Sequence, residues 1–155
     1  MSNVAAIAQD TLNKYWDHTL PVNPFAIAYN MGVNVSFDPA LSVSGYFDYN
    51  NGTPLILINP QESLVRQRFT VFHELGHFVL GHGPSPRDPN CNYNINNYVL
   101  KERDANAFAA EMIMPGETVH LYVNKGYSVS DMARLFDVSE QAMSIRLERL
   151  GYGDI

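Results

Sequence analysis

The sequence predicts an α+β fold in which a small antiparallel or mixed three-stranded sheet packs on a helical core. Three observations predict this class. Strand patterns gather within residues 33–58, a long helix after them carries an H-E-x-x-H motif, and the C-terminal part is a helical segment that resembles a helix-turn-helix. The chain has 155 residues and is 46% hydrophobic, which is close to one average domain with enough apolar surface for a core.

The N-terminal part of the chain predicts two helices followed by three strands. Apolar residues three and four positions apart predict an amphipathic helix over Val4–His18. Asn23 and Pro24 are typical of an N-cap with proline in the first turn, so a short helix should run to about Met31. The turn residues Asn50–Gly52 predict a hairpin between the last two strands. The expected strands are Val33–Phe37, Val43–Tyr49 and Pro54–Ile58.

Two long helices are predicted in the middle of the chain. Asn59–Glu62 has the cap, proline and glutamate that begin a helix, which should run to Leu80 or His82. The second should cover about Tyr98–Met114 and end at the proline that follows. The polar, proline- and asparagine-rich run Pro84–Asn97 is expected to be an exposed loop between them.

The H-E-x-x-H motif indicates metal chemistry. At about 100° per residue, His73 and His77 lie about 40° apart and one turn along the helix, so both imidazoles can reach one ion. Glu74 sits beside that face, where it can hold a water molecule as a general base without being a ligand. This is the pattern of zinc hydrolases, and the alternative is an ordinary helix with solvent-facing histidines.

A catalytic zinc site needs a third protein ligand. His82 is close in sequence, but nine residues after His73 on one helix it should point away, as a helix-end histidine favoured by the dipole. Glu102 is the better candidate, because Asn106 one turn later can orient a ligating histidine. Asp104 lies about 200° from Glu102, so at most one of these carboxylates faces the site. The alternative is an ordinary charged, alanine-rich helix.

Three segments closely resemble the paired signatures of ImmA/IrrE-type metallopeptidases. They are Phe69–His77, Glu102–Ala110 and Met112–Pro115. The resemblance implies a gluzincin-like fold, one zinc ion per chain, and cytoplasmic cleavage of DNA-binding repressors, commonly Xre-type helix-turn-helix proteins. This agrees with the absence of a secretory signal pattern and of a long apolar run, which predicts a cytoplasmic location and no membrane partner.

The resemblance also implies roles for individual residues. His73, His77 and Glu102 would be the zinc ligands. Glu74 would be the general base. Asn106, where related peptidases often have Asp, would support a ligand from outside the metal's own coordination shell.

Charge argues against nucleic acid as a direct partner. Ten Lys and Arg against sixteen Asp and Glu give a net charge of −6, which repels phosphate. Within Ser128–Leu150, three arginines face four acids, so we favour packing or partner recognition over DNA binding for the helix-turn-helix-like segment. We expect residues 1–120 to form a metallopeptidase-like domain with N-terminal helices, and residues 121–155 to form a helical extension packed on the same unit.

Three function classes follow from the sequence. The leading one is a zinc metalloendopeptidase acting on a protein substrate, followed by a non-proteolytic repressor-binding protein and then by a DNA-binding regulator. The hairpin Val43–Ile58 can take up an extended substrate by strand addition or simply cover the core. Cys91 is either a regulatory thiolate or incidental. The candidate tyrosines for oxyanion stabilisation are Tyr46, Tyr49, Tyr93 and Tyr98.

Overall fold

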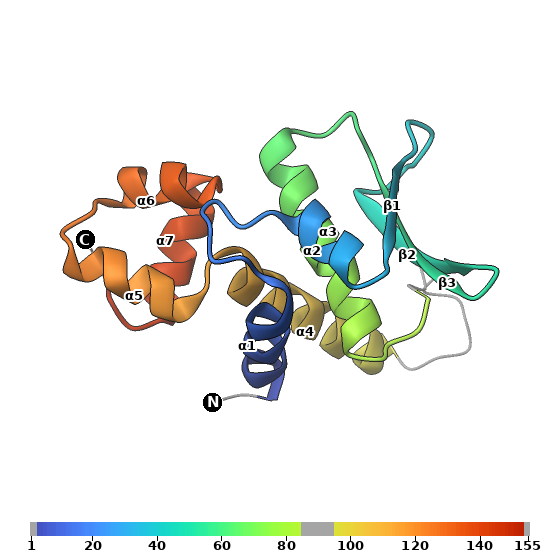
Figure 1. Ribbon diagram of the computed structural model, residues 1–155, viewed down its shortest axis with the longest axis horizontal. Coiled ribbons are helices and arrows are strands. Elements are labelled where there is room, and N and C mark those ends of the chain that lie inside the picture. The colour runs from blue at the N-terminus through green and yellow to red at the C-terminus, as the bar shows by residue number, and fades with distance from the viewer. Residues whose placement is uncertain (1–2, 85–94, 154–155) are drawn as a thin grey trace.

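The computed structural model describes residues 3–84 and 95–153, and Figure 1 shows their arrangement. The helices within these ranges are α1 (Asn3–Tyr15), α2 (Pro24–Asn30), α3 (Leu64–Val79), α4 (Ile95–Ile113), α5 (Gly116–Asn124), α6 (Val129–Phe136) and α7 (Glu140–Arg149). The strands are β1 (Asn34–Phe37), β2 (Gly45–Asn50) and β3 (Thr53–Ile58). The predicted α+β class is confirmed. No helix in the described ranges is long and apolar enough to cross a membrane.

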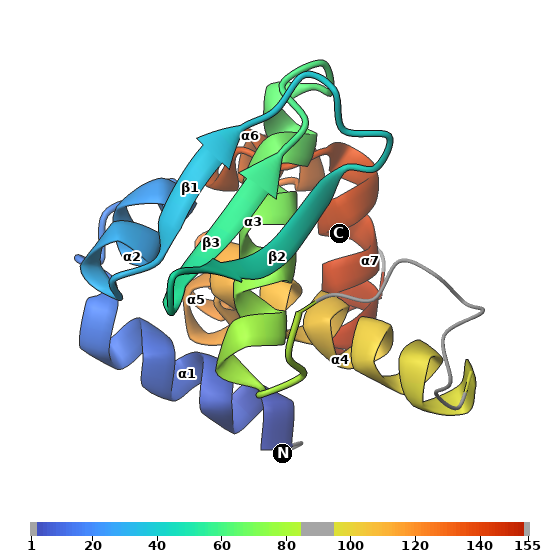
Figure 2. The same ribbon diagram turned by 90° about the vertical axis from the view of Figure 1, so that its right-hand side faces the viewer.

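The sheet is mixed and has the strand order β1-β3-β2. β1 runs parallel to β3 and β2 runs antiparallel to it. Asn51 and Gly52 have φ angles of 52° and 83°, the positive values that a tight two-residue hairpin turn requires. Phe47, Ile56 and Ile58 are fully buried, and Figure 2 shows the strands lying across α3. The sheet therefore covers one side of the helix that carries the H-E-x-x-H motif.

On its other side, α3 packs closely against α4. Gly76 makes this possible, because a Cβ there would lie 3.1 Å from the Phe108 ring and 3.3 Å from the Ala105 Cα atom. Phe72 and Leu75 on α3 are fully buried and belong to the same hydrophobic core as Phe108 on α4. The two helices that carry the candidate ligands are therefore held at short separation.

The predicted start of α3 was wrong. Asn59 and Pro60 resemble a helix start, but the Asn59 Oδ1 atom accepts a hydrogen bond from the Gln61 amide at 2.9 Å, which forms a turn before the helix. Ser63 is the N-cap, since its Oγ atom accepts from the Arg66 amide at 3.2 Å. α3 thus begins at residue 64. α1 ends three residues earlier than predicted, and α4 begins three residues earlier.

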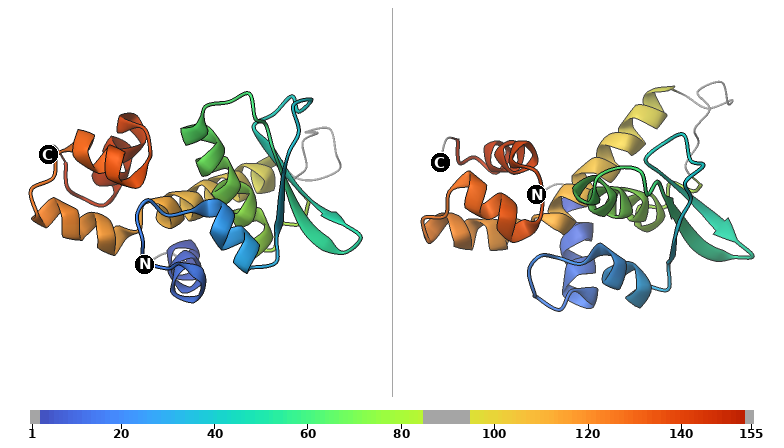
Figure 3. Two further views of the ribbon diagram at one scale, coloured as in Figure 1. Left: turned by 45° about the horizontal axis from the view of Figure 1, so that its top comes forward. Right: turned by 90° about the horizontal axis from the view of Figure 1, so that it is seen from above.

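The C-terminal helices lie at the end of the molecule opposite the sheet (Figure 3). Arg146 on α7 pairs with Glu111 on α4, and Arg68 on α3 lies 3.2 Å from Asp137 between α6 and α7. These ion pairs connect the C-terminal helices to α3 and α4. The helix-turn-helix assignment and the predicted domain boundaries stay predictions. The buried side chains that join α6 and α7 are Met132, Phe136, Met143 and Leu147.

Candidate metal centre

Three donor side chains gather on the buried side of α3. One ligand atom from each of His73, Glu74 and His77 lies within 4.8 Å of the other two. Glu74 and His77 are each only 1% exposed. Burying such polar groups costs free energy unless a partner compensates, so their placement points to a function rather than to packing.

α4 brings Glu102 to both histidines. Its Oε2 atom lies 2.6 Å from the His77 Nε2 atom, and its Oε1 atom lies 3.5 Å from the His73 Nε2 atom. The charge of Asp104, the alternative carboxylate, acts on His82, as the charge of Glu102 also does. Of the two acids that the sequence left open, Glu102 is the one whose carboxylate lies against both histidines, and its role as a metal ligand stays a prediction.

These residues fit a divalent metal ion. The His77 Nε2 atom is buried and makes no hydrogen bond in the described part of the chain, because its short contact with Glu102 does not have hydrogen-bond geometry. A second imidazole nitrogen, that of His73, faces the same carboxylate. Two imidazoles and one carboxylate are a donor set of catalytic zinc sites, and a bound cation would satisfy the buried nitrogen.

Each histidine also has a partner on its other ring nitrogen. The His73 Nδ1 atom lies 2.8 Å from the Asn106 Oδ1 atom. An amide oxygen can only accept, so this contact places the proton of a neutral His73 on Nδ1 and leaves Nε2 free to bind a metal. The His77 Nδ1 atom lies 2.9 Å from the His82 Nδ1 atom. Both rings are thus oriented with Nε2 toward Glu102.

The prediction that His82 points away from the other histidines was wrong. It assumed a continuous helix, whereas α3 ends at Val79 and Gly81 adopts a left-handed φ of 73°. The chain therefore turns back, and the His82 amide donates to the His77 carbonyl at 2.9 Å. A glycine immediately after the last apolar residues of a helix is the sequence signal for such a turn.

The electrostatic surroundings keep the site carboxylate ionised. Burial favours the neutral form of Glu102, but the close contacts with His73 and His77 and the charges of the two imidazoles outweigh burial and hold the pKa of Glu102 well below its usual value. Burial likewise opposes protonation of His73, yet Glu102, Glu74 and Asn106 together raise its pKa. For His82, burial and the positive charges of His77 and Lys101 lower the pKa. A metal ion would take the place of the positive charge that Glu102 now faces.

Comparison with known proteins places the chain in a family. Residues 28–148 match the Peptidase_M78 family, described as the IrrE N-terminal-like domain. The chain belongs to this family. The resemblance noted in the sequence is thereby confirmed. A metallopeptidase acts through a divalent metal ion, and the donor set on α3 and α4 fits one.

Two relatives of this Peptidase_M78 member show the same relationship at low identity. The chain is 26% identical over 134 residues to the "Uncharacterized immunity region protein 2" of Bacillus phage phi105, covering 84% of this chain and 80% of that protein. It is 27% identical over 111 residues to "Metallopeptidase ImmA" of Bacillus subtilis (strain 168), covering 70% of this chain and 64% of ImmA.

A solved structure shares the fold. A "Mycobacterium tuberculosis transcriptional regulator" superposes with a TM-score of 0.69 at 16% identity, covering 96% of this chain and 47% of the regulator. This Peptidase_M78 chain therefore spans about half of the regulator and just under two thirds of ImmA. At this identity the likeness shows a common fold only.

A cleft of about 410 Å³ opens onto the candidate metal centre of this family member. Its walls include His73, Glu74 and Glu102 on the helices and Gly45 at the start of β2. A Cβ at Gly45 would lie 2.5 Å from the Thr70 side chain, so glycine is what lets the strand approach α3. β2 is an edge strand of the sheet, and strand addition of a substrate segment stays a prediction.

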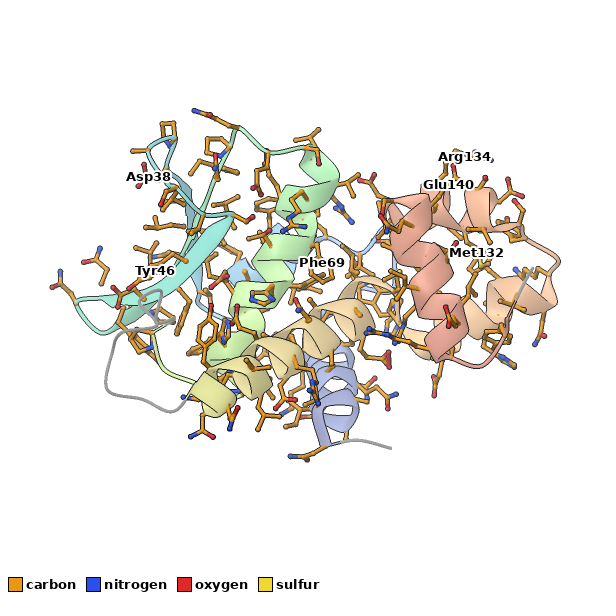
Figure 4. All side chains as sticks on the ribbon, turned by 180° about the vertical axis from the view of Figure 1, so that it is seen from behind. Asp38, Tyr46, Phe69, Met132, Arg134 and Glu140 are labelled. Carbon is orange, nitrogen blue, oxygen red and sulfur yellow. The ribbon has the colours of Figure 1, made fainter. Side chains whose placement is uncertain are left out.

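The candidate tyrosines lie in different surroundings. Tyr46 is on β2 (Figure 4), and the Tyr49 ring packs on Phe47 with a centroid distance of 5.2 Å. Tyr98 is on α4 one turn before Glu102, in the wall of a second, larger hollow. Tyr93 and Cys91 fall outside the described residues. The identity of an oxyanion-stabilising tyrosine therefore stays a prediction.

Proposed function

We propose that this chain is a zinc metalloendopeptidase that hydrolyses one peptide bond in a protein substrate. The observation that carries the proposal is the position of Glu102, whose two carboxylate oxygens face the Nε2 atoms of His73 and His77. Glu74 lies beside them as a carboxylate that is buried and yet lines the cleft. Membership of the Peptidase_M78 family supports the same chemistry.

The proposed roles follow from these positions. Held by His73, His77 and Glu102, a zinc ion would supply Lewis-acid activation of water and of the scissile carbonyl. Glu74 accepts a proton from the attacking water on a carboxylate oxygen and gives it to the nitrogen of the leaving amine. Asn106 keeps the proton of His73 on Nδ1 and the ring in one orientation.

We extend the proposal to the substrate and the compartment. The resemblance to ImmA/IrrE-type peptidases implies an Xre-type helix-turn-helix repressor, cleaved in the cytoplasm. The names of two relatives, an immunity region protein and the metallopeptidase ImmA, are compatible with this substrate. The C-terminal helices are then assigned to packing and protein recognition, and direct DNA binding is not expected because the chain carries a net charge of −6.

Metal content is the first test. We expect about one zinc ion per purified chain by elemental analysis, and its loss in His73→Ala, because two protein ligands do not hold a catalytic zinc ion stably. Glu74→Gln should retain the metal, since Glu74 is assigned as a base and not as a ligand. A purified chain that binds no divalent metal would overturn the assignment.

Cleavage of a repressor is the second test. The helix-turn-helix repressor encoded beside this chain's gene is incubated with wild type and with Glu74→Gln, and fragments are measured by intact mass. Wild type should give two fragments and Glu74→Gln none, and chelation should stop cleavage until zinc is restored. Repressor that binds wild type and stays intact would favour the non-proteolytic alternative. A salt-dependent mobility shift of operator DNA by the chain itself would favour the DNA-binding regulator.

A further inference from the structure

A second hollow lies directly beside the metal cleft. It is a groove of about 1360 Å³ between α4 and α7, with parts of α1 and α5 in its walls. Pockets for small ligands usually measure about 300–1,000 Å³, so this groove suits a larger occupant. It shares Phe69, Glu102 and Asn106 with the metal cleft. A polypeptide that lies in the groove therefore leads straight to the candidate zinc ligands.

The groove is lined by apolar side chains that are open to solvent. Val99 on α4 is 49% exposed, Ile145 on α7 is 43% exposed and Leu150 is 37% exposed, and all three line it. The small side chains of Ala107 and Ala110 on α4 also line the groove. Contiguous exposed apolar surface of this kind marks an interaction site, because it costs free energy to leave it in water.

The charged residues that line the groove indicate the charge of its partner. Arg103 on α4 and Arg149 on α7 both line the groove and are exposed, and neither forms an ion pair among the described residues. Arg146, by contrast, is committed to Glu111. Glu102 also lines the groove, but its carboxylate faces the histidines of the metal centre. Glu117 is the remaining acid in the lining, and it is exposed. Among the lining residues that pair with no described residue, two are cations and one is an acid, which favours carboxylates on the occupant.

The walls of the groove are almost entirely helical, and this favours a helical occupant. Helices pack by fitting ridges of side chains into grooves on neighbouring helices. An amphipathic helix binds to a protein surface by placing its apolar side in a hydrophobic groove. Phe69 on α3 lies between the metal cleft and the C-terminal helices (Figure 4), at the junction of the two hollows. A chain that leaves the groove there enters the cleft beside His73.

We propose that the α4–α7 groove docks an acidic amphipathic helix of the substrate protein. The apolar side of that helix lies on Val99, Ile145 and Leu150, and its carboxylates pair with Arg103 and Arg149. The assignment of this partner as the substrate rests on the proposed peptidase function. α7 is also the second helix of the segment whose sequence resembles a helix-turn-helix.

Binding of designed peptides tests the groove without cleavage. The probe is a fluorescein-labelled peptide of about 16 residues with Leu at positions i, i+3, i+4 and i+7 and Glu on its polar side. Two control peptides carry Lys in place of each Glu, or the same residues in scrambled order. Fluorescence anisotropy is measured at low salt with the full chain carrying Glu74→Gln, with and without metal. The acidic amphipathic peptide should bind at least about fivefold more tightly than either control peptide.

Variants locate the binding site. Ile145→Glu should weaken binding about tenfold or more, because it places a charge in the apolar floor and repels the acidic peptide. Leu121→Glu is the matched control, since Leu121 is an apolar residue on α5 that is 48% exposed and lies outside the groove, and it should change binding less than about twofold. Arg149→Glu provides a second variant on the exposed rim. Circular dichroism checks that each variant is folded.

Each outcome decides the proposal. Failure of the acidic peptide to bind, equal binding of the Lys peptide, or unchanged binding to Ile145→Glu and Arg149→Glu would overturn it. Failure of the peptidase function gives a different result. A chain that binds the peptide and cleaves no repressor would support the docking site and contradict the peptidase function. Conversely, if wild type and Ile145→Glu cleave the repressor with the same kcat/KM, the peptidase function is supported and the docking site is contradicted.

Discussion

Two helix pairs of this molecule are built around opposite kinds of side chain. Between α3 and α4, Glu74 and His77 are buried and Glu102 reaches across to the histidines. Between α6 and α7, the buried residues that the structure describes are apolar, and Met132 and Phe136 are fully enclosed. Polar burial opposes folding and apolar burial drives it. Substitutions should therefore separate metal affinity, which resides in the first pair, from stability supplied by the second.

Phe136→Ala should have the largest effect on stability. Phe136 is fully buried, and removing such a ring costs about 3–5 kcal/mol of unfolding free energy through lost burial and a cavity. The metal affinity of the folded protein should not change, because the candidate ligands are on α3 and α4 and not on this helix pair. Urea denaturation and zinc titration measure the two quantities, with Leu121→Ala as the exposed control. A parallel fall in metal affinity would show that the two pairs are not separable.

Arg146→Met should have the next largest effect, because it breaks the link between the two pairs. Glu111 is 5% exposed and would be left without its guanidinium, while the Met114 carbonyl loses a hydrogen bond from Arg146 Nε at 3.0 Å. Losing one partner of a buried ion pair costs about 3 kcal/mol or more. The double variant Glu111→Leu, Arg146→Met should recover part of this loss in urea denaturation. No recovery would mean that Arg146 acts mainly through its packing.

The same contrast explains what the sequence could predict. The spacing of His73 and His77 is local to one helix, and the turn at Asn51–Gly52 is local to one hairpin, so short-range rules suffice. Glu102 could be named because helical spacing limits which acids share a face with Asn106.

Other features depend on tertiary contacts or on competing local signals. Arg146 and Glu111 are 35 residues apart in sequence, and nothing near either residue indicates the other. The groove between α4 and α7 was missed for the same reason. At the start of α3, Asn59 and Ser63 both resemble caps, and only the surrounding structure decides between them. The position of His82 depends on the residue at which α3 ends.

Asn106→Ala tests the α3–α4 pair separately, and it should lower the affinity for the metal. Without the 2.8 Å contact to His73 Nδ1, the imidazole loses its fixed orientation, which typically costs about 10–100-fold in affinity. Stability without metal should change little. Competition with a chromophoric chelator measures the effect, and Asn106→Asp should restore affinity because a carboxylate accepts the same hydrogen bond. Asn97→Ala, on an exposed position of α4, is the control, and equal affinities of the two alanine variants would refute the role.

Ser128→Ala should have the smallest effect of these substitutions, and it should act only on the stability of the α6–α7 pair. The Ser128 Oγ atom accepts from the Asp131 amide at 3.1 Å, and the Asp131 carboxylate accepts from the Ser128 amide at 3.3 Å, which forms a capping box at the start of α6. Losing the serine should cost about 1 kcal/mol in urea denaturation. Ser63→Ala on α3 removes a single cap bond of 3.2 Å and should cost no more than this.

The caps of α6 and α3 should also differ in how their stability contribution depends on pH. The hydrogen bonds with Ser128 lower the pKa of Asp131 below its ordinary value of 3.8. A lowered pKa in the folded state contributes stability above pH 3.8 that is lost as the pH falls through the folded-state pKa. The cost of Ser128→Ala should therefore shrink in acid, whereas the cost of Ser63→Ala should not, because no carboxylate shares that cap. Equal pH dependence of the two variants would show that the Asp131 carboxylate adds nothing to the start of α6.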